Sequence, residues 1–582
     1  MARVIGIDLG TTYSAVAVLD GGKPRILADQ NGRRTLPSIV SFLPGSVMVG
    51  EAAREKEYLE PARTVKRIKR RMGSDWKFEV DNKTYTPEEI SSFILRALKE
   101  QAERELGTKV KDAIVTVPAY FNDNQRQATK NAGQLAGLNV LRIINEPTAA
   151  SLAYGVKDTD DLNLVVYDLG GGTLDVSVLN VSDGVFEVIS TAGDNHLGGE
   201  DFNQRLADAV TARFQDETGI DLNVDPLAMV KVFEAVEKAK IELSILESTR
   251  IEVPFVTADE SGPRNIDFEI TREELERMIG DYVERSLELC RQALNDAKLG
   301  KEAVDRVIMV GGSSRIPLVR RKVAEFFGRE TDHSLHPDEV VAMGAAIQGG
   351  IVQGEVSGIV LVDVTPMSLG IEVEDGYFVP VIERNSPIPT AAKRVFTTVA
   401  DGQKSVDVQV FQGESMYVKN NVSLGRFRLE GIRSASKGAP RIEVTFELDV
   451  NGILAVSAQD MDTGAAQSIT IRNDFRLTPE DLARLEQKHA SSFGDEIGKR
   501  ERLTRVLKSK TRAESIASRI ESAVPPAYRE ALVKNELSEL LADIDASVKE
   551  LDEEKAERAI GRLEFIHSEL AAGSLRFGEM IA

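Results

Sequence analysis

Two stretches of the chain, about 160 residues apart, share an arrangement of residues that could bind a polyphosphate. Ile5–Thr12 reads IGIDLGTT and Val165–Thr173 reads VVYDLGGGT. Each is an apolar run, then Asp, then a glycine-rich turn ending in Thr, and alternating apolar residues follow both. Glycine lets the backbone approach an anion closely, and successive N–H groups in such a turn form a concave anion site. The pattern therefore predicts two β-hairpins with phosphate-binding tips.

The pairing of the two motifs is more informative than either motif alone. Two turns that face one another can hold a polyphosphate from both sides, and Asp8 and Asp168 can hold a hydrated Mg²⁺ beside it. One glycine-rich turn would be weak support for a nucleotide site. Two similar turns at the spacing of a domain favour a duplicated fold that clamps a nucleotide.

The length and charge restrict the classes of protein to which the chain can belong. A chain of 582 residues exceeds what one hydrophobic core supports, so we expect three or four domains. The formal net charge of −21 argues against general affinity for nucleic acid, which needs a surplus of Lys and Arg. The same negative charge argues against docking on anionic membranes.

The sequence predicts a cytoplasmic protein. No apolar run approaches the length of a membrane-spanning helix, Asp8 interrupts the apolar start, and no basic segment precedes a long apolar one. Cys290 is the single cysteine, so a disulfide within the chain is impossible. The amphipathic helical pattern around Cys290 predicts a buried, unreactive thiol. A reducing compartment fits these features.

Three regions follow one another along the chain. Residues 1–355 alternate strand-like and helical segments, as in an α/β domain. Residues 365–474 have a period of two, which predicts an antiparallel β-sandwich, and Asp401-Gly402 and Asn451-Gly452 are tight-hairpin signals within it. From Leu477 the pattern is helical. The specific expectations for the first region are strands at Val110–Val117 and Val304–Val310 and helices at Asp123–Leu135 and Met229–Leu246.

The boundaries between these regions carry signals of their own. Ile359–Asp363 is apolar, and either a buried strand or a linker explains it; its position between two compositional regimes favours the linker. Thr478-Pro479-Glu480-Asp481 predicts a helix start, with a capping Thr and acids at the positive end of the helix dipole. An apolar stripe between Leu537 and Leu551 predicts a further helix, and Pro525-Pro526 separates the helices into groups.

Several long, co-linear stretches resemble the DnaK-type chaperones, the 70-kDa heat-shock protein family. These stretches are Ile7–Tyr13, Val115–Phe121 (VTVPAYF), Ile143–Ala150 (IINEPTAA), Asp168–Thr173, His196–Phe202 (HLGGEDF) and Pro337–Gly350. The resemblance implies a multidomain fold: an actin-like, two-lobed α/β ATPase, then a β-sandwich that binds peptide, then an α-helical lid. The implied boundaries are 1–355 for the ATPase, 356–364 for the linker, 365–474 for the sandwich and 475–582 for the lid.

The resemblance assigns roles at the nucleotide site position by position. The catalytic set is Asp8, Lys69, Glu146, Asp168, Thr173 and Asp175, of which Asp8, Asp168 and Asp175 surround Mg²⁺. Which carboxylate acts as base, if any, stays open, and Thr173 matches a slow autophosphorylation site or is an ordinary turn threonine. ATP or ADP, Mg²⁺ and K⁺ are the implied cofactors. The implied nucleotide contacts are Gly10, Thr11, Thr12, Tyr13, Gly170, Gly171, Gly172, Gly198, Gly199, Glu237, Lys240, Ser244, Gly311, Gly312, Ser313, Arg315 and Asp338.

Two further sets follow from the same resemblance. The implied peptide contacts are Ile371, Val373, Glu374, Phe396, Val399, Val406, Val408 and Phe411, although core packing explains about half of a strand's apolar residues. The implied allosteric residues are Pro118, Arg126, Arg142, Val360, Leu361 and Asp363, with Arg142 at the J-domain contact. The chain departs from the family at Asn195, commonly Thr, and at Glu374-Asp375-Gly376, where an apolar residue and Gly-Gly are common. Two acids at this arch predict a preference for apolar peptides flanked by Lys or Arg.

The resulting expectation is a stress-response chaperone in which ATP hydrolysis switches client affinity through the linker. Its expected partners are unfolded or nascent polypeptides, a J-domain cochaperone and a GrpE-type nucleotide exchange factor, with no nucleic acid and no membrane. A short lid predicts faster client release, and the ending Gly578–Ala582 argues against cochaperones that read an EEVD tail. One alternative is a family-derived scaffold or exchange factor with little client cycling. A sugar or acetate kinase, or a filament, on the same scaffold is a weaker one.

Overall fold

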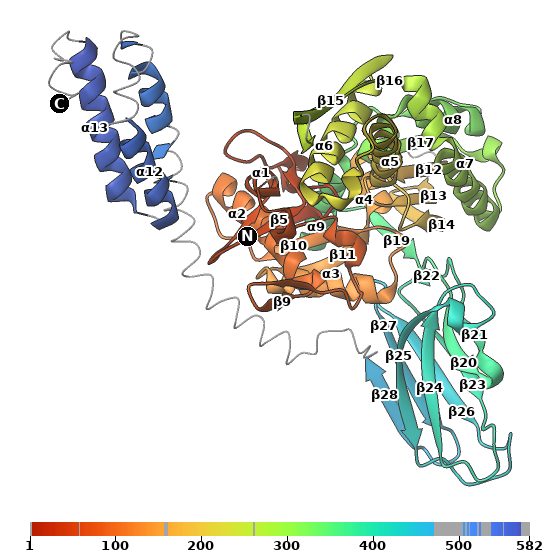
Figure 1. The fold of residues 1–582 in the computed structure, drawn as a ribbon. Helices are drawn as coiled ribbons and strands as arrows, with labels where there is room; N and C mark the ends of the chain where they lie inside the picture. Colours follow the sequence, from red (N-terminus) through yellow and green to blue (C-terminus); the bar gives the residue numbers. More distant parts are fainter. Residues whose placement is uncertain are drawn as a thin grey trace. The chain divides into compact units, whose positions relative to one another are not determined.

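The computed structural model describes residues 3–57, 59–155, 161–259, 262–470, 505–506, 509–510, 512–520, 523–524, 537–550 and 552–571 (Figure 1). The chain divides into two compact units, residues 1–43 with 47–483 and residues 44–46 with 484–582. The first unit contains two lobes, each built on its own sheet, and a β-sandwich. The multidomain fold expected from the sequence is confirmed.

The first lobe is built on a sheet in the order β11-β10-β1-β2-β3, with β4 paired to β2. Its strands β1 and β2 form the antiparallel hairpin predicted at the first glycine-rich turn, and β10 runs parallel to β1. The strand predicted at Val110–Val117 is β10, which begins two residues later. The bounds are β1 Val4–Asp8, β2 Tyr13–Asp20, β3 Lys23–Ile26, β4 Leu36–Pro37, β10 Asp112–Val117 and β11 Asn139–Asn145; the smaller strands of this lobe are β5 Ile39–Leu43, β6 Ser46–Val49, β7 Thr64–Lys66, β8 Phe78–Val80 and β9 Lys83–Tyr85.

The second lobe repeats the arrangement of the first around the other glycine-rich turn. Its sheet has the order β18-β17-β12-β13-β14-β19-β22. Strands β12 and β13 form the second predicted hairpin, and β17 runs parallel to β12 as β10 does to β1. The two lobes are therefore a duplicated unit. The bounds are β12 Leu162–Leu169, β13 Leu174–Ser182, β14 Val185–Asp194, β17 Arg306–Val310, β18 Thr331–Asp332, β19 Val360–Val364 and β22 Pro387–Ile388; a separate hairpin pairs β15 Ser248–Asp259 with β16 Gly262–Thr271.

Helices cover both sheets, and local sequence explains their limits. The helix predicted at Asp123–Leu135 has these bounds as α3, because Asn122 caps it. The helix predicted at Met229–Leu246 is α6, which starts three residues earlier, because the Asp225 side chain accepts hydrogen bonds from two of its first N–H groups. The bounds are α1 Glu51–Glu57, α2 Pro87–Leu106, α3 Asp123–Leu135, α4 Glu146–Tyr154, α5 Gly199–Thr218, α6 Pro226–Leu243, α7 Arg272–Ala297, α8 Pro317–Phe327 and α9 Val340–Gln353.

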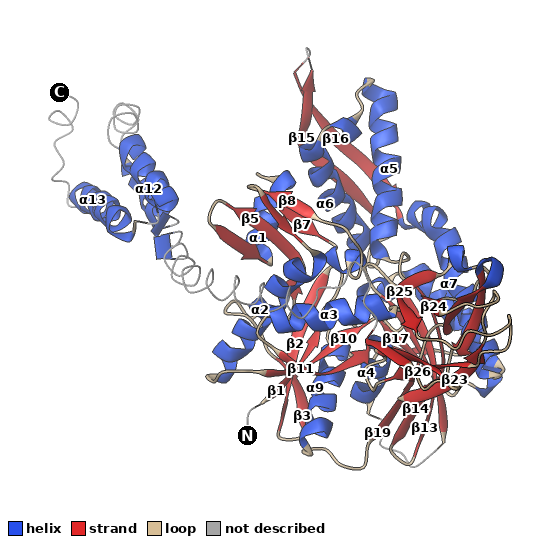
Figure 2. Cartoon of the chain, turned by 90° about the horizontal axis from the view of Figure 1, so that it is seen from below, coloured by secondary structure: helices blue, strands red, loops and turns tan. Residues whose placement is uncertain are grey.

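Two helices, α4 and α9, pack tightly between the lobes (Figure 1). A Cβ at Gly344 of α9 would lie 1.7 Å from the Ala149 carbonyl oxygen of α4, so a side chain has no room at this crossing. Helices α5 and α6 run beside the β15–β16 hairpin in the outer part of the second lobe (Figure 2). Each element that carries a glycine-rich turn is thus backed by rigid secondary structure.

The segment between the lobes and the sandwich is itself a strand. Val360–Val364 forms β19, which pairs in parallel with β14 and antiparallel with β22. The strand interpretation of this apolar stretch is therefore right about its conformation, and its place between two domains is compatible with a linking role. Val360 remains 54% exposed although its backbone is paired.

The β-sandwich packs two four-stranded sheets, β21-β20-β24-β25 and β23-β26-β27-β28. Asn451-Gly452 makes the predicted hairpin turn between β26 and β27. The hairpin predicted at Asp401-Gly402 is wrong, because β23 pairs with β26 whereas β24 pairs with β20 and β25, so this turn crosses between sheets. The bounds are β20 Leu369–Val373, β21 Tyr377–Ile382, β23 Thr390–Phe396, β24 Ser405–Gln412, β25 Val422–Glu430, β26 Ile442–Leu448, β27 Leu454–Asp460 and β28 Ala466–Thr470.

The described part of the second compact unit after residue 484 is mainly helical. Residues 512–520 are helical, and α12 Ser538–Glu550 and α13 Glu553–Ala571 follow. The apolar stripe predicted near residue 540 contributes Leu537 and Ile544 to a buried cluster with residues of α13. The predicted helix start at residues 478–481 and the chain end at 578–582 lie outside the described residues. In the part of the chain that the structure describes, no helix is both long and apolar enough to span a bilayer.

Candidate functional site

A cleft of about 600 Å³ lies between the two lobes and has both glycine-rich turns in its walls. Most of the residues that sequence reasoning assigned to the nucleotide line this one cleft. They are Asp8, Gly10, Thr11, Thr12, Tyr13, Lys69, Glu146, Asp168, Gly170, Gly171, Thr173, Glu237, Lys240, Ser244, Gly311, Gly312, Ser313, Arg315 and Asp338. A cleft of this size with convergent polar groups is typical of a small-molecule site.

The two turns touch each other across the cleft, and glycine is required where they meet. A Cβ at Gly171 would lie 2.1 Å from the Thr12 hydroxyl, and one at Gly172 would lie 2.4 Å from the Thr11 hydroxyl. Gly198, at the start of α5, has the Gly171 carbonyl within 2.6 Å of its ideal Cβ position. The bare backbone of the second turn therefore packs directly against the Thr11 and Thr12 side chains of the first, and glycine-rich turns of this kind can present N–H groups to an anion.

Lys69 is the residue of the basic segment 66–70 that enters this cleft. Its side chain is buried, with the residue 4% exposed, and Nζ donates to Glu146 Oε1 at 2.5 Å. Burial lowers the pKa of Lys69, but the carboxylates of Glu146 and Asp8 outweigh it, so the net shift is upward. A fully charged amine at this depth can hold a phosphoryl oxygen and offset the charge that develops on it.

Three buried carboxylates face Lys69 and one another. Burial, followed by the charge of Glu146, raises the pKa of Asp8 to about 7 and that of Asp175 to about 7, and the same two causes raise the pKa of Asp168. Asp175 Oδ1 accepts from the Tyr120 N–H, whereas Oδ2 is buried without a hydrogen-bond partner. These buried carboxylates carry more negative charge than Lys69 can neutralise, so the site favours the binding of a further cation.

The donor set fits Mg²⁺ held through water. Among the residues that the structure describes, no three acidic, histidine or cysteine side chains converge closely enough to ligate one ion directly. Mg²⁺ keeps several of its own waters and commonly takes only one or two carboxylates together with phosphate oxygens. The carboxylates of Asp8 and Asp168, together with the unpartnered Asp175 Oδ2, can accept hydrogen bonds from the waters of such an ion.

The opposite end of the cleft is formed by α6 and the turn after β17. Glu237, Lys240 and Ser244 line it from α6, and the Lys240 Nζ donates to the Gly199 carbonyl at 2.9 Å. Burial lowers the pKa of Lys240. Arg315, in the short helix η5 (Gly312–Arg315), makes an ion pair with Asp338 at 2.8 Å, which fixes its planar guanidinium at the cleft wall. A fixed guanidinium suits stacking on a base.

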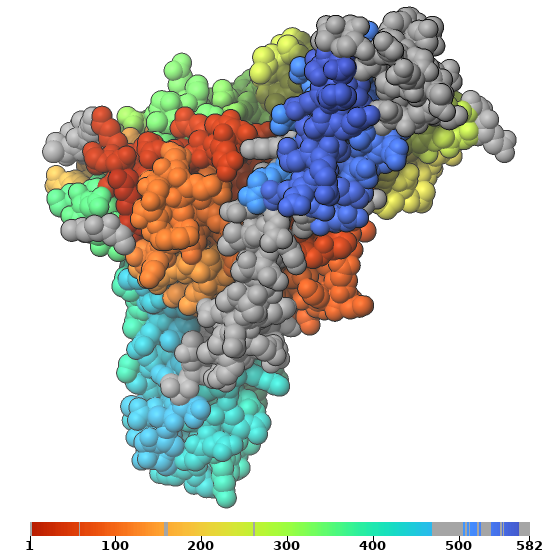
Figure 3. All heavy atoms as spheres, turned by 90° about the vertical axis from the view of Figure 1, so that its left-hand side faces the viewer, coloured from red at the N-terminus to blue at the C-terminus, as the bar shows by residue number. Residues whose placement is uncertain are grey.

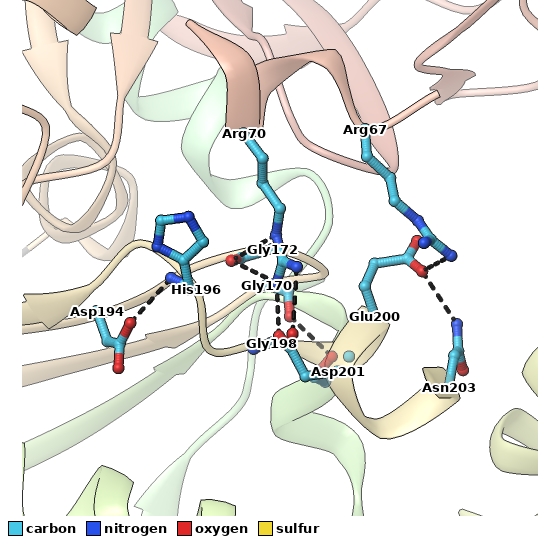
Figure 4. A network of polar contacts seen from close by, with 12 residues as sticks. Arg67, Arg70, Gly170, Gly172, Asp194, His196, Gly198, Glu200, Asp201 and Asn203 are labelled. Carbon is cyan, nitrogen blue, oxygen red and sulfur yellow. Dashed lines mark hydrogen bonds and ion pairs between the residues drawn. The ribbon is translucent and has the colours of Figure 1, made fainter. Parts of the chain in front are cut away.

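Sequence reasoning missed the polar network behind the second glycine-rich turn (Figure 4). Arg70 donates to the Gly172 carbonyl at 2.8 Å and forms an ion pair with Asp201 at 2.5 Å, while Arg67 forms an ion pair with Glu200. Asp201 also accepts from the Gly198 N–H at 2.8 Å and so caps α5. The basic run at 66–70 and the acids of HLGGEDF were visible in the sequence, but nothing in it showed that they pair across the lobes.

Asn195, where the resemblance led us to expect Thr, binds the same first-lobe residue as Asp175. Its side-chain amide donates to the Tyr120 carbonyl at 3.2 Å, and its Oδ1 is buried without a partner. Because Asp175 accepts from the N–H of the same Tyr120, the two residues of the second lobe hold both backbone groups of one residue of the first lobe. Pro118, assigned to signal relay, lies two residues before Tyr120, directly after β10.

A second polar cluster joins the first lobe to β19. The buried Asp363 accepts from Asn145 at 2.8 Å and from Thr148 at 3.1 Å. Asn145 in turn accepts from Arg126 at 2.7 Å, and Arg126 also donates to the Ala119 carbonyl. Burial raises the pKa of Asp363 and lowers that of Arg126, each opposed by the charge of the other. The structure thus brings together Arg126 and Asp363, which the sequence places more than 200 residues apart.

The β-sandwich contacts the first lobe beside this cluster, where the orange surface that includes α3 meets the cyan strands in Figure 3. The Asp123 N–H donates to Gln412 at 3.0 Å, and the Asp123 carboxylate accepts from the Leu454 N–H at 2.8 Å. The Ile143 N–H donates to Asn451 at 2.9 Å. Arg142, one residue earlier, is mostly buried, and burial lowers its pKa. The contacting residues Gln412 and Asn451 carried no functional signal in the sequence.

A separate contact joins the second lobe to the loop before β22. Arg384 forms an ion pair with Asp296 of α7 at 2.6 Å, and the Asn385 side chain accepts from the Thr191 N–H at 3.1 Å. The sandwich is therefore tied to both lobes, by polar contacts that a small movement could break. Polar contacts of this kind are typical of interfaces between domains that move.

The residues assigned to the client peptide separate into two groups. Ile371 and Val408 are buried in the core between the two sheets, together with partly buried Val373, Phe396 and Val406, so core packing explains their apolar character here. Val399 is exposed in the loop after β23. Glu374 lies in the turn between β20 and β21, where it makes an ion pair with Lys437 at 3.4 Å. Lys437 thus offsets part of the negative charge expected at this arch.

The comparison with known families gives one finding that spans the chain. A family model described as Hsp70 protein matches residues 4–581. The match covers both lobes, the sandwich and the helical region, so it bears on the molecule as a whole.

Removing the Lys69 amine is expected to abolish hydrolysis while nucleotide binding persists. In Lys69→Ala the glycine turns that hold the phosphates are intact, but the cation that faces the developing charge is gone. We expect the single-turnover rate of ATP hydrolysis to fall by about 10²–10³-fold. Arg71→Ala is the matched control, because Arg71 lies over Trp76 within the first lobe. Hydrolysis at an undiminished rate in Lys69→Ala would contradict this role.

Proposed function

Because the chain belongs to the Hsp70 family, we propose that it couples ATP hydrolysis to client binding through β19 and the Asp363 cluster. In general terms the protein is an ATP-dependent chaperone with ATPase activity, which binds ATP or ADP with Mg²⁺, unfolded polypeptides and cochaperones. The proposal concerns how this chain performs that activity: which residues hold the nucleotide, and which contacts carry its state to the sandwich.

The observation that carries the proposal is the continuous set of contacts from cleft to sandwich. Asp168 of the cleft wall lies opposite Asp175 on the β12–β13 hairpin. Asp175 binds the Tyr120 N–H, and Arg126, on the next helix, binds the carbonyls on either side of Tyr120 and also Asn145. Asn145 in turn binds Asp363 of β19. Each link from Asp175 onward is a hydrogen bond between groups that are mostly buried, where an unpaired partner is costly. A change of charge at Asp175 would therefore be felt at β19.

At the cleft we propose that the chain holds ATP between its two turns and orients the γ-phosphate toward Lys69. Mg²⁺, when bound, neutralises phosphate charge and polarises the phosphoryl group. Asp8, Asp168 and Asp175 would hold its waters, and Glu146 keeps the Lys69 amine in place through their 2.5 Å hydrogen bond. Thr173, at the tip of the second turn, is positioned at the same cleft. K⁺ would serve as the further cation that so acidic a site requires.

At the sandwich we propose that extended apolar clients bind at the partly buried Val373, Phe396 and Val406 and the exposed Val399, under the arch at Glu374. In one of two states the sandwich contacts the lobes and β19 pairs with β14. In the other state the sandwich would separate from the lobes, and this separation would change the affinity for client. A J-domain cochaperone would act at Arg142, beside the Asn451 contact, where it can bias docking. A GrpE-type factor would act by opening the lobes around the nucleotide.

The coupling is tested by placing charges on β19. In Val360→Asp with Leu361→Asp, a carboxylate would replace the Leu361 side chain that packs against the hydrophobic core beside β14, so β19 should no longer pair stably with β14 in the docked state. We expect unfolded polypeptide to stimulate single-turnover ATP hydrolysis several-fold in the unchanged protein and not at all in this variant, with the basal rate retained. Val224→Asp is the control, because Val224 is 80% exposed on the second lobe, away from β19. Stimulation that survives in the double variant would refute the coupling role.

The arch is tested with peptides that share an apolar centre and differ in their flanks. Glu374 and Asp375 are expected to favour flanking Lys or Arg, by a small factor because the Glu374–Lys437 pair is exposed and exposed pairs are weak, about 0.2–1 kcal/mol. The measurement is a peptide array read at low and high salt, with Glu374→Gln and Asp375→Asn combined as the comparison. Equal binding of acid-flanked and base-flanked peptides by the unchanged protein would contradict the prediction.

A further inference from the structure

We propose that Arg67 is a positioning residue that, with Glu200 and Phe233, forms a clasp across the mouth of the cleft and sets how fast nucleotide leaves. We call Arg67, Glu200 and Phe233 the Arg67 clasp. The inference rests on the proposed nucleotide site, and it adds a rate-setting contact outside that site. Arg67 does not line the nucleotide cleft.

One guanidinium joins the first lobe to two helices of the second. Arg67 lies between β7 and the short helix η2 (Ile68–Arg71), on the same segment as Lys69. Its guanidinium forms an ion pair with the buried Glu200 of α5, as Figure 4 shows. The same guanidinium lies 5.2 Å from the ring centroid of Phe233 on α6, a distance at which a cation is attracted to an aromatic face.

Glu200 connects this ion pair to both glycine-rich turns. Its backbone N–H donates to the Gly171 carbonyl at 2.8 Å, and its Oε1 faces the Thr12 hydroxyl at 3.5 Å. Arg67 therefore holds the residue at which the two turns and α5 meet. When the ion pair breaks, Glu200 loses its cation, and the contact between the turns loses a support from the first lobe.

Phe233 connects the clasp to the helix at the other end of the cleft. It precedes Glu237 by four residues on α6, so the two side chains lie about one turn apart on a similar face. The Lys66 amine also lies over the Phe233 ring, at 5.7 Å. The ring thus receives two cations from the first lobe, and α6, with Glu237 and Lys240, is held against that lobe.

The seam that the clasp closes is otherwise hollow. A second cavity of about 360 Å³ adjoins the nucleotide cleft, shares Thr11, Thr12 and Tyr13 with it, and is lined by all three clasp residues. The Nε of Arg67 and the Oδ1 of Asn203 border this cavity, buried and without protein partners. Packed side chains do not fill this hollow, so directed contacts such as the clasp matter more along this edge.

The backbone of Arg67 indicates that its placement has a cost. Arg67 has φ +60° and ψ +26°, the left-handed region that side-chain residues rarely adopt. Such conformations persist where surrounding contacts hold them in place.

Arg70, three residues on, also bridges the lobes, but it binds the Gly172 carbonyl of the turn itself. Arg67 reaches the turns only through Glu200, so its removal leaves the hydrogen bond from Arg70 to the Gly172 carbonyl in place.

The experiment measures release of a fluorescent ADP analogue from the full-length protein by stopped flow. Arg67→Ala is expected to release it about tenfold faster, the change that ~1.4 kcal/mol of lost closure gives. Arg67→Lys should recover part of this loss, because it keeps the charge for Glu200 but loses the planar group over Phe233. Arg213→Ala is the matched control, since Arg213 pairs with Glu217 and lies 4.1 Å from the Phe268 ring within the second lobe alone.

Two further readouts separate a positioning role from general loosening of the fold. Single-turnover hydrolysis of bound ATP should stay within about twofold in Arg67→Ala, because Lys69 and its carboxylates are untouched. Phe233→Leu should also speed release, and the two changes combined should speed it by less than the product of their separate effects, since they share the contact between Arg67 and Phe233.

The outcomes distinguish the clasp from the proposed function. Unchanged release in Arg67→Ala, equal acceleration in Arg213→Ala, a matching fall in hydrolysis, or fully multiplicative effects with Phe233→Leu would each overturn the clasp. If Arg67→Ala does not fold, Phe233→Leu and Arg67→Lys carry the same test, and unchanged release in both would overturn it. An unchanged protein that binds no ADP would instead contradict the proposed nucleotide site.

Discussion

The contact between the two glycine-rich turns is the constraint on which the rest of the molecule depends. Gly171 and Gly172 meet the Thr12 and Thr11 side chains at distances that leave no room for a Cβ, so this close approach of the lobes requires glycine in the second turn. A phosphate held there is bound by both lobes at once. Any change in that phosphate therefore changes how the lobes fit together, and the elements attached to each lobe move with them.

Electrostatics explains why this junction responds to its ligand. Asp8, Asp168 and Asp175 are buried near the Lys69 amine, and their pKa values rise because burial, followed by the nearby charge of Glu146, disfavours their ionised forms more than Lys69 favours them. A nucleotide with its cations changes this balance. Asp175 is bonded to Tyr120, and the bonds run on through Arg126 and Asn145 to Asp363 on β19, so the charge state of the cleft and the pairing of the linking strand are physically connected.

The sequence was sufficient for what depends on local pattern. The near-repeat at Asp8 and Asp168 predicted two hairpins, which are β1–β2 and β12–β13, and Asn122 and Asp123 marked the start of α3. The sequence was insufficient where partners are distant. Asp401-Gly402 has the residues of a hairpin turn, yet the strands on either side of it, β23 and β24, belong to different sheets and pair with different strands. Arg67 and Phe233 each resemble ordinary surface residues until the fold places them together.

The account's central claim is that the nucleotide controls whether β19 stays paired with β14. The most direct measurement is hydrogen exchange at the backbone amides of Val360–Val364, sampled with a brief deuterium pulse after ATP is added and again with ADP bound. The account predicts strong protection with ATP and fast exchange with ADP, with β14 protected in both because β13 pairs with it on its other edge. Equal protection of β19 in the two states would contradict the account, because the strand would then be a fixed part of the fold.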